Sequence, residues 1–396
     1  MKPTLRYRRV LWLSYAAGGL SAALTNFALA WGSSRYGAAA LGGTLLAGML
    51  PGLMLNLVGG VLADRIEPRH ALLAGAALNA LVLLGMAGAL ALEPGPFVFV
   101  AGSLALSVLG SLLGSFGYVI PAALFPEDEL VRVNAQLSLA SDAAHLAGPL
   151  LGGLLFSVAG SAGVLVLAAV PTLAAGLLLL GLPPLPRSGG GETLDLAHAG
   201  AGFAYLVRSA RILRPVLFLA VANLFAAAFE VAAPLYAAGL GGVGAYALLT
   251  AAMNLGMTVS NLALAAAPLR SSEQLILAAA LVQGLALVGL GRSRSLPGAA
   301  ALGALNDAMA NVSGTVFIAY LQARLPEDLL GRVFAAVNTV AMLLTPLGFA
   351  AAPWLIERVG PGAAIMALGT GTAAAAAALL WFFRDVGGSG LEKDHS

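Results

Sequence analysis

The chain has 396 residues, of which 60% are hydrophobic and 10% charged, and its mean hydropathy is +0.92. Soluble domains carry about 25% charged residues, so this composition excludes an ordinary soluble protein. Its apolar runs of about 20 residues favour membrane-spanning helices over the alternating strands of a β-barrel. The net charge of +2 does not indicate a nucleic-acid partner, and the absence of cysteine excludes disulfides and thiolate metal sites.

Twelve apolar runs, separated by charged or Gly/Pro-rich breaks, predict twelve transmembrane helices. Their expected limits are 10–31, 40–62, 71–91, 97–119, 133–157, 162–182, 213–237, 243–267, 273–291, 298–321, 333–356 and 362–383. The first run is too long for a signal peptide and is expected to remain as a span. All but four of the twenty Lys and Arg residues fall on the side that holds both termini. The positive-inside rule therefore predicts a multi-pass protein of the cell (inner, plasma) membrane with cytoplasmic termini.

A repeat at a separation of 200 residues indicates a duplication. Pro326-Glu327-Asp328 repeats Pro126-Glu127-Asp128, and in both places a charged turn precedes a long apolar run. We therefore predict an all-α integral membrane protein built from two pseudo-symmetric six-helix bundles, a transporter architecture. The bundles are expected at 1–182 and 213–385. They flank a cytoplasmic linker at 183–212 that contains an amphipathic helix, and a polar tail follows at 386–396.

The end of the second predicted span carries a charged motif, formed by Gly60, Asp64, Arg65 and Arg69. It resembles the loop signature G-x-x-x-D-R-x-x-R of the major facilitator superfamily, from which the chain departs at Glu67 and Pro68. The resemblance implies the twelve-helix fold of that superfamily, transport by alternating access, and a charged cluster that latches one conformation. The alternative is a charged loop that only sets the topology.

The fifth predicted span contains Gly148-Pro149-x-x-Gly152-Gly153. This cluster resembles the core of the motif found in proton-coupled antiporters of the superfamily, although alanines replace two of the glycines of the longer motif. The alternative is a proline kink with a small-residue packing face. Residues 195–214 and 325–333 also resemble an enterobactin-exporter-like and macrolide-efflux-like branch. Together these resemblances imply an exporter, but the fourth predicted span lacks the arginine that many proton antiporters carry there.

Four ionisable side chains fall well inside predicted spans: Asp142, His145, Glu230 and Asp307. A carboxylate at the centre of a membrane helix costs about 2.5–3.5 kcal/mol, so such residues are expected to mark a proton or substrate path. Asp142 and Asp307 are expected near the midplane and Glu230 in the outer third of the membrane. The alternatives are a polar staple between helices for Asp142 and His145, and pairing with Arg292 or Arg294 for Glu230.

Uncharged polar residues extend this predicted path, namely Asn26, Asn223 and Asn306. Walls of Phe, Leu, Ala and Met suit a small hydrophobic or amphipathic solute, such as a drug or a siderophore-like compound. We therefore predict a proton-coupled secondary exporter that works as a monomer in the bilayer, uses the proton gradient and needs no cofactor. An importer or a lipid-type flippase of the same fold is the alternative. An enzyme is not expected, because the sequence contains no nucleophile–base pair or metal-binding spacing near a membrane surface.

Overall fold

The apolar runs fold as helices throughout the part of the chain that the computed structural model describes, which is residues 3–93, 95–185, 203–266, 271–325 and 330–387. The chain divides into two compact units. Unit 1 comprises Met1–Thr193 and Gly241–Ala251, and unit 2 comprises Leu194–Leu240 and Ala252–Ser396. Much of the predicted linker, the tail after residue 387 and the repeated turn at 326–329 lie outside the described residues.

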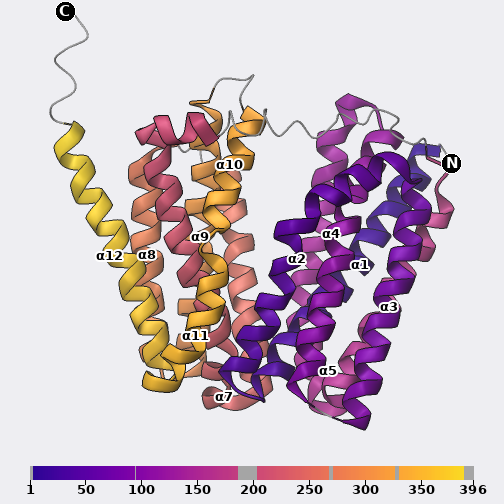
Figure 1. Cartoon of the computed structure of the whole chain (residues 1–396), viewed down its shortest axis with the longest axis horizontal. Helices are drawn as coiled ribbons and strands as arrows, with labels where there is room; N and C mark the ends of the chain where they lie inside the picture. Colours follow the sequence, from indigo (N-terminus) through magenta and orange to yellow (C-terminus); the bar gives the residue numbers. More distant parts are fainter. Residues whose placement is uncertain (1–2, 94, 186–202, 267–270, 326–329, 388–396) are drawn as a thin grey trace, which may run out of the picture. The chain divides into compact units, whose positions relative to one another are not determined.

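Unit 1 consists mainly of five long helices and a short 3-10 helix (Figure 1). These are α1 (Pro3–Ser34), α2 (Ala38–Arg65), α3 (Pro68–Leu92), α4 (Pro96–Leu124), α5 (Glu127–Leu178) and η1 (Leu179–Gly181). Proline occupies the first turn of α3 and α4, where a missing N–H breaks no helical hydrogen bond. Within α5 the helical path breaks at Gly160, whose φ of 62° is readily adopted only by glycine.

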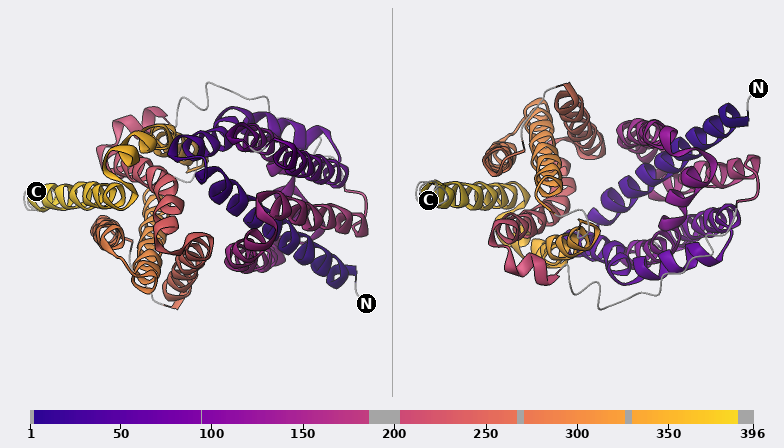
Figure 2. Two further views of the ribbon diagram at one scale, coloured as in Figure 1. Left: turned by 90° about the horizontal axis from the view of Figure 1, so that it is seen from below. Right: turned by 90° about the horizontal axis from the view of Figure 1, so that it is seen from above.

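In unit 1, α1 packs along α5, as the end-on views of Figure 2 show. The Ser21 hydroxyl lies 2.8 Å from the Ala168 carbonyl oxygen, to which it donates, and also bonds Thr172. Around this seam, Phe27, Trp31, Phe99, Phe156 and Leu165 form the buried core of the unit. Hydrogen bonds between hydroxyls and carbonyls, together with close packing, stabilise the association of membrane helices, because the hydrophobic effect does not favour helix association within lipid.

Unit 2 begins, in the described part, with a helical turn at residues 203–208. It continues with α7 (Ala210–Ala266), α8 (Glu273–Arg292), α9 (Leu296–Gln322), α10 (Leu330–Met342), α11 (Thr345–Val359) and α12 (Pro361–Gly387). The path of α7 breaks at Gly241 and Gly242, with φ values of 153° and 71°. The segment directly after this break, residues 241–251, packs in unit 1.

Two details of the helix boundaries differ from the sequence-based expectation. The span predicted at 333–356 is interrupted between Met342 and Thr345, because Pro346 lacks an N–H and its ring would clash with the Met342 carbonyl. The charged turn that was predicted to begin at Pro126 is instead the start of α5, with Pro126 as its N-cap. Acidic residues favour a helix N-terminus electrostatically, so Glu129 suits its place in the first turn.

Eight helices in the described part are long and apolar enough to cross a membrane. The prediction of an all-helical, multi-pass membrane protein is therefore confirmed. Two of these candidates, Arg132–Gly181 and Ile212–Ala266, contain the glycine breaks described above and have 50 and 55 residues. At 1.5 Å per residue each is more than twice the length that a 30 Å hydrocarbon core requires.

Candidate transport site

Two acidic residues predicted from the sequence come together in unit 2. Glu230 lies on α7 and Asp307 on α9, and their carboxylates are close enough to interact electrostatically. Glu230 is solvent-accessible although it lies among many protein atoms, and Asp307 is half-buried. Two like charges in such a place repel each other, and one bound proton or cation relieves the repulsion.

Glu230 and Asp307 lie at similar distances from one end of the unit. The α7 segment that carries Glu230 ends at Gly241, close to the point where α9 begins. The Tyr236 hydroxyl oxygen lies 2.7 Å from the carbonyl oxygens of Leu290 and Ser293, which places the Gly241 end of this α7 segment beside the start of α9. Glu230 precedes Gly241 by eleven residues, and Asp307 follows Leu296 by eleven residues. Both therefore lie about 16 Å from that end at 1.5 Å per residue. The two residues are therefore expected at a similar depth, and the position of Glu230 in the outer third of the membrane remains a prediction.

Pairing of Glu230 with Arg292 or Arg294 does not occur among the described residues, whose ion pairs involve other groups. Both arginines are exposed; Arg292 is the last residue of α8 and Arg294 lies in the turn that follows it. The charged group that acts on Glu230 is another acid, Asp307, whereas a glutamate that only reaches for the membrane surface would avoid a like charge. This arrangement favours a functional role over simple snorkelling.

Asn306 orients Asp307 from the adjacent position on α9. The Asn306 Nδ2 donates to Asp307 Oδ1 at 2.8 Å, and Asn306 itself is buried. The Asn306 Oδ1 is also buried and has no hydrogen-bond partner among the described residues. An unpaired buried acceptor costs about 1–3 kcal/mol, and a transported solute or water with a donor group would relieve that cost.

Further along α9, a set of amides and hydroxyls joins α9 to α7 and was not predicted from the sequence as a network. The Asn311 Nδ2 donates to Ser260 Oγ at 2.9 Å and to Asn261 Oδ1 at 2.7 Å. At Gly256 the two helix backbones touch: a Cβ built there would lie 2.0 Å from the Ala304 carbonyl oxygen. This contact lies a short distance along α9 from Asp307, and it shows that α9 approaches α7 as closely as their backbones allow.

The other predicted path residues lie apart from this pair or have structural partners. Asp142 and His145 lie three residues apart on one face of α5 in unit 1, and both are half-buried. Asn26 is exposed on α1. The Asn223 Nδ2 donates to the Ala341 carbonyl oxygen at 2.9 Å, so this side chain joins α7 to α10. The proposed roles of these residues remain predictions.

The Gly148–Gly153 cluster lies at the crossing of α5 with α1. A Cβ at Gly148 would lie 2.2 Å from the Ala23 Cβ, and one at Gly152 would lie 2.8 Å from the Phe27 ring. Pro149 is accommodated inside α5 and is buried. Gly348 in unit 2 follows Gly148 at the 200-residue separation of the repeat. It makes the same kind of contact, because a Cβ there would lie 2.3 Å from the Leu224 carbonyl oxygen. Both copies of the repeat thus use a glycine for close helix packing.

The predicted latch lies at the turn between α2 and α3. Gly60, Asp64 and Arg65 belong to α2, and their side chains lie outside the described part. The Arg69 Nη1 donates to the Leu182 carbonyl oxygen at 2.9 Å, and the Arg69 Nε lies 3.8 Å from Glu67 Oε1. Arg69 thus contacts the end of the helical segment after Gly160, within the same unit.

The sequence matches the family model described as the Major Facilitator Superfamily over residues 11–293. That match covers well over half of the chain. The chain belongs to the Major Facilitator Superfamily. No match is found among curated proteins.

Solved structures of other transporters have the same fold. The nucleoside transporter NupG matches with a TM-score of 0.76 at 12% identity, over 97% of this chain and 99% of that chain. A POT family transporter in complex with a thioalcohol-conjugated peptide matches with a TM-score of 0.74 at 13% identity, over 96% of each chain. A POT family transporter with 5-aminolevulinic acid matches with a TM-score of 0.71 at 14% identity, over 95% and 96%. Identities this low show the shared fold alone.

Glu67, where the chain departs from the superfamily loop signature, has several partners in the structure. The backbone N–H groups of His70 and Leu185 each donate to its carboxylate at 3.2 Å, and the His70 ring also contacts it. Burial alone would raise the pKa of the Glu67 carboxyl. The two backbone donors, with the charges of His70 and Arg69, outweigh burial and hold this pKa below its ordinary value of 4.5. Glu67 therefore caps α3 and ties it to the chain after η1.

Replacing Glu67 by alanine is expected to lower the free energy of unfolding by about 1–2 kcal/mol at pH 7, because an N-cap and a tertiary contact are lost. Since the folded pKa is depressed, this contribution exists above pH 4.5 and decreases as the pH falls through the folded value. Thermal unfolding in detergent at pH 7 and pH 4 measures both effects. Glu93→Ala, at the exposed opposite end of α3, is the control. Equal stability of the two variants at pH 7 would contradict the role of Glu67.

Proposed function

We propose that the chain is a proton-coupled secondary transporter with twelve transmembrane spans arranged as two six-helix bundles. Eight helices have membrane length and composition. The 50- and 55-residue candidates each count as two crossings once they are divided at Gly160 and at Gly241–Gly242. The helices α1 and α9, with 32 and 27 residues, are long enough to supply the remaining two.

The observation that carries the proposal is the proximity of Glu230 and Asp307 in unit 2. A membrane protein accepts the desolvation of acidic groups where they bind an ion or a proton. Neither residue has a Lys or Arg partner among the described ion pairs. Two carboxyl groups without a basic partner can bind one proton between them. They can release it when a conformational change alters their environment. Asn306 holds one of the carboxylates in place.

The proposed direction is export, with Asp142 and His145 as a second proton-binding position. This direction rests on the resemblance of the Gly148–Gly153 cluster to the antiporter motif. The close contacts of Gly148 and Gly152 with α1 support the motif's role as a packing element. These contacts lie one to three helical turns beyond Asp142 and His145 on α5, so packing of α5 on α1 would respond to protonation of these residues.

The proposed solute is a small hydrophobic or amphipathic compound. Buried aromatic and aliphatic side chains dominate both units, and the amides of Asn261 and Asn311 bond each other. A polar solute would need such amides to be available. Uptake of a polar solute is the competing function, because the structural neighbours include a nucleoside transporter and a peptide-bound transporter.

Two successive measurements test the proposal. Thermal stabilisation of the purified protein is first measured across a panel that includes amphipathic amines, nucleosides and dipeptides. The stabilising compound is then followed in proteoliposomes with either an acidic lumen or an acidic exterior. A proton antiporter accumulates solute when the lumen is acidic, because outward proton flow drives inward solute flow whichever way the protein is inserted. Accumulation only with an acidic exterior would show symport, and rates independent of the gradient would refute proton coupling.

A further inference from the structure

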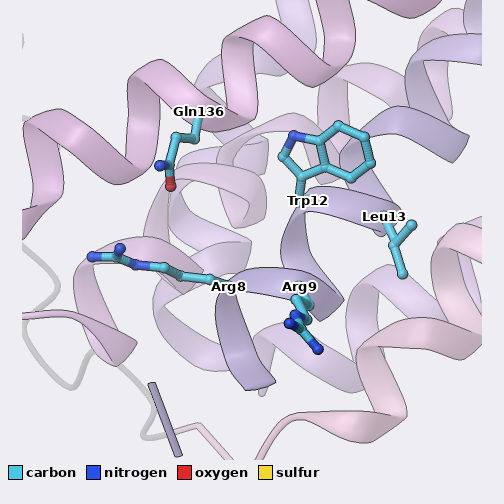
Figure 3. Close-up of a pocket in the computed structure, with 5 residues that line it drawn as sticks. All are labelled: Arg8, Arg9, Trp12, Leu13 and Gln136. Atoms are coloured by element: carbon cyan, nitrogen blue, oxygen red, sulfur yellow. The ribbon is translucent and has the colours of Figure 1, made fainter. Parts of the chain in front are cut away.

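A groove in unit 1 lies apart from the residues discussed so far as a transport site. It has a volume of about 460 Å³ and is lined by Arg8, Arg9, Trp12, Leu13 and Gln136. The first four residues belong to the start of α1 and the fifth to α5 (Figure 3). The two helices are joined at this level, because Arg8 Nη2 lies 2.7 Å from Glu129 Oε2. We call this cavity the arginine–tryptophan groove.

The polar end of the groove is cationic. Arg8 is held by Glu129 and lies over the Phe125 ring at 5.8 Å from its centroid, while its buried Nε has no hydrogen-bond partner among the described residues. Arg9 is exposed and forms no ion pair in the described part of the chain. Because Glu129 balances Arg8, Arg9 leaves a positive charge at the groove. Figure 3 shows the Gln136 carboxamide and the Arg8 guanidinium extending into the same space.

The other end of the groove is apolar and exposed. Trp12 and Leu13 are 46% and 48% exposed, although they belong to a membrane-length helix. On α5, Leu139 is 64% exposed and follows Gln136 by three residues, so it lies on the same face. Arginines followed within one turn by tryptophan are typical of the membrane interface, where the cation meets headgroups and the indole lies at their level.

A ligand that satisfies both ends needs a negative group and an apolar chain. Phosphate oxygens accept hydrogen bonds from guanidinium groups with good geometry. Basic pockets between transmembrane helices on the cytoplasmic side bind anionic lipid headgroups. A small soluble anion would use the arginines but would gain nothing from Trp12, Leu13 and Leu139. The exposed apolar surface therefore favours a lipid over free phosphate.

We propose that the arginine–tryptophan groove binds one anionic phospholipid, with its phosphate at Arg9 and Gln136 and an acyl chain against Trp12 and Leu13. The site is distinct from the Glu230–Asp307 pair and does not depend on the direction or substrate of transport. It rests on the predicted cytoplasmic position of the start of α1, and it requires that α1 and α5 hold the relative position that the Arg8–Glu129 pair and the Gly148–Ala23 contact give them.

The test uses the purified full-length protein in detergent and two lipids with identical brominated acyl chains, phosphatidylglycerol and phosphatidylcholine. Bromine quenches tryptophan fluorescence on contact, and the difference between the wild type and Trp12→Phe isolates Trp12 among the four tryptophans. We expect phosphatidylglycerol to quench Trp12 at a concentration at least fivefold lower than phosphatidylcholine. Arg9→Gln should remove this preference.

Arg6→Gln is the matched control, because Arg6 is exposed on the same helix and does not line the groove. This variant should keep the full preference. The proposal is overturned if Arg9→Gln binds phosphatidylglycerol as the wild type does, or if Arg6→Gln weakens it equally, which would show only a general charge effect. Displacement of the lipid by millimolar inorganic phosphate would also overturn it in favour of a small-anion site. Native mass spectrometry of each variant provides the stoichiometry, expected to be one retained phosphatidylglycerol.

Discussion

The Asp307→Asn variant is expected to lose at least nine-tenths of its pH-driven transport while it still exchanges solute across a membrane without a pH gradient. The amide has nearly the shape of the carboxylate but carries no titrating proton, so it removes the repulsion with Glu230 permanently. Such a protein can still bind solute and change conformation, but proton movement no longer drives it. Proteoliposome uptake driven by an imposed gradient, compared with solute counterflow at equal pH, separates the two activities.

Glu230→Gln should have the same effect. If the two carboxylates bind one proton between them, as proposed, they act as a unit, and the double variant should be no worse than either single variant. Glu357→Gln, an exposed acid on α11, is the control that should keep wild-type coupling. Asp142→Asn tests the second predicted position in the same assay. Wild-type coupling in both Asp307→Asn and Glu230→Gln would refute the proposed proton site.

Gly256→Ala is expected to reduce the free energy of unfolding by about 1–3 kcal/mol and to abolish transport. The new methyl group would meet the Ala304 carbonyl oxygen at 2.0 Å, and a backbone atom cannot rotate away as a side chain can. The two helices must therefore separate, which moves Asn306 and Asp307 from their positions. Melting temperature in detergent and the uptake assay measure the two consequences.

The matched control is Gly314→Ala on α9, where a Cβ meets nothing within 4 Å. In an unobstructed helix position, alanine is more stable than glycine by about 0.5–1 kcal/mol. Gly314→Ala should therefore melt at the same temperature as the wild type or a higher one, and Gly256→Ala below it. If both variants behave alike, the contact of α7 with α9 is looser than the structure indicates.

The helices were largely predictable from the sequence, because long apolar runs indicate the helices and glycine-rich gaps indicate the breaks between them. The breaks at Gly160 and at Gly241–Gly242 fall in predicted gaps. The interruption before Pro346 was missed, since Pro149, Pro171 and Pro234 lie inside helices without ending them. In membrane helices neighbouring groups can satisfy the carbonyl that a proline leaves free, so proline alone does not locate a helix end.

The candidate site was predictable only as separate residues. Glu230 and Asp307 stand out because acids are rare in apolar runs, but their proximity depends on how α7 and α9 pack. The estimate of depth for Glu230 was measured from the distant cytoplasmic end of its span, whereas the contact of Tyr236 with Ser293 gives a nearer reference point. The role of Glu67 was also hidden, because its partner Leu185 lies 118 residues away in sequence.

The turns at Gly160 and Gly360 each pass from one helix to the next with a single residue in an unusual backbone conformation. A connection of this length has no slack, so the adjoining ends of its two helices must stay close together. Since the chain contains no cysteine, pairs of spin labels can be introduced without first removing native thiols. Labels placed next to either turn, one on each helix, should give the same distance with and without solute. That distance is a reference against which distance changes elsewhere in the transporter can be compared.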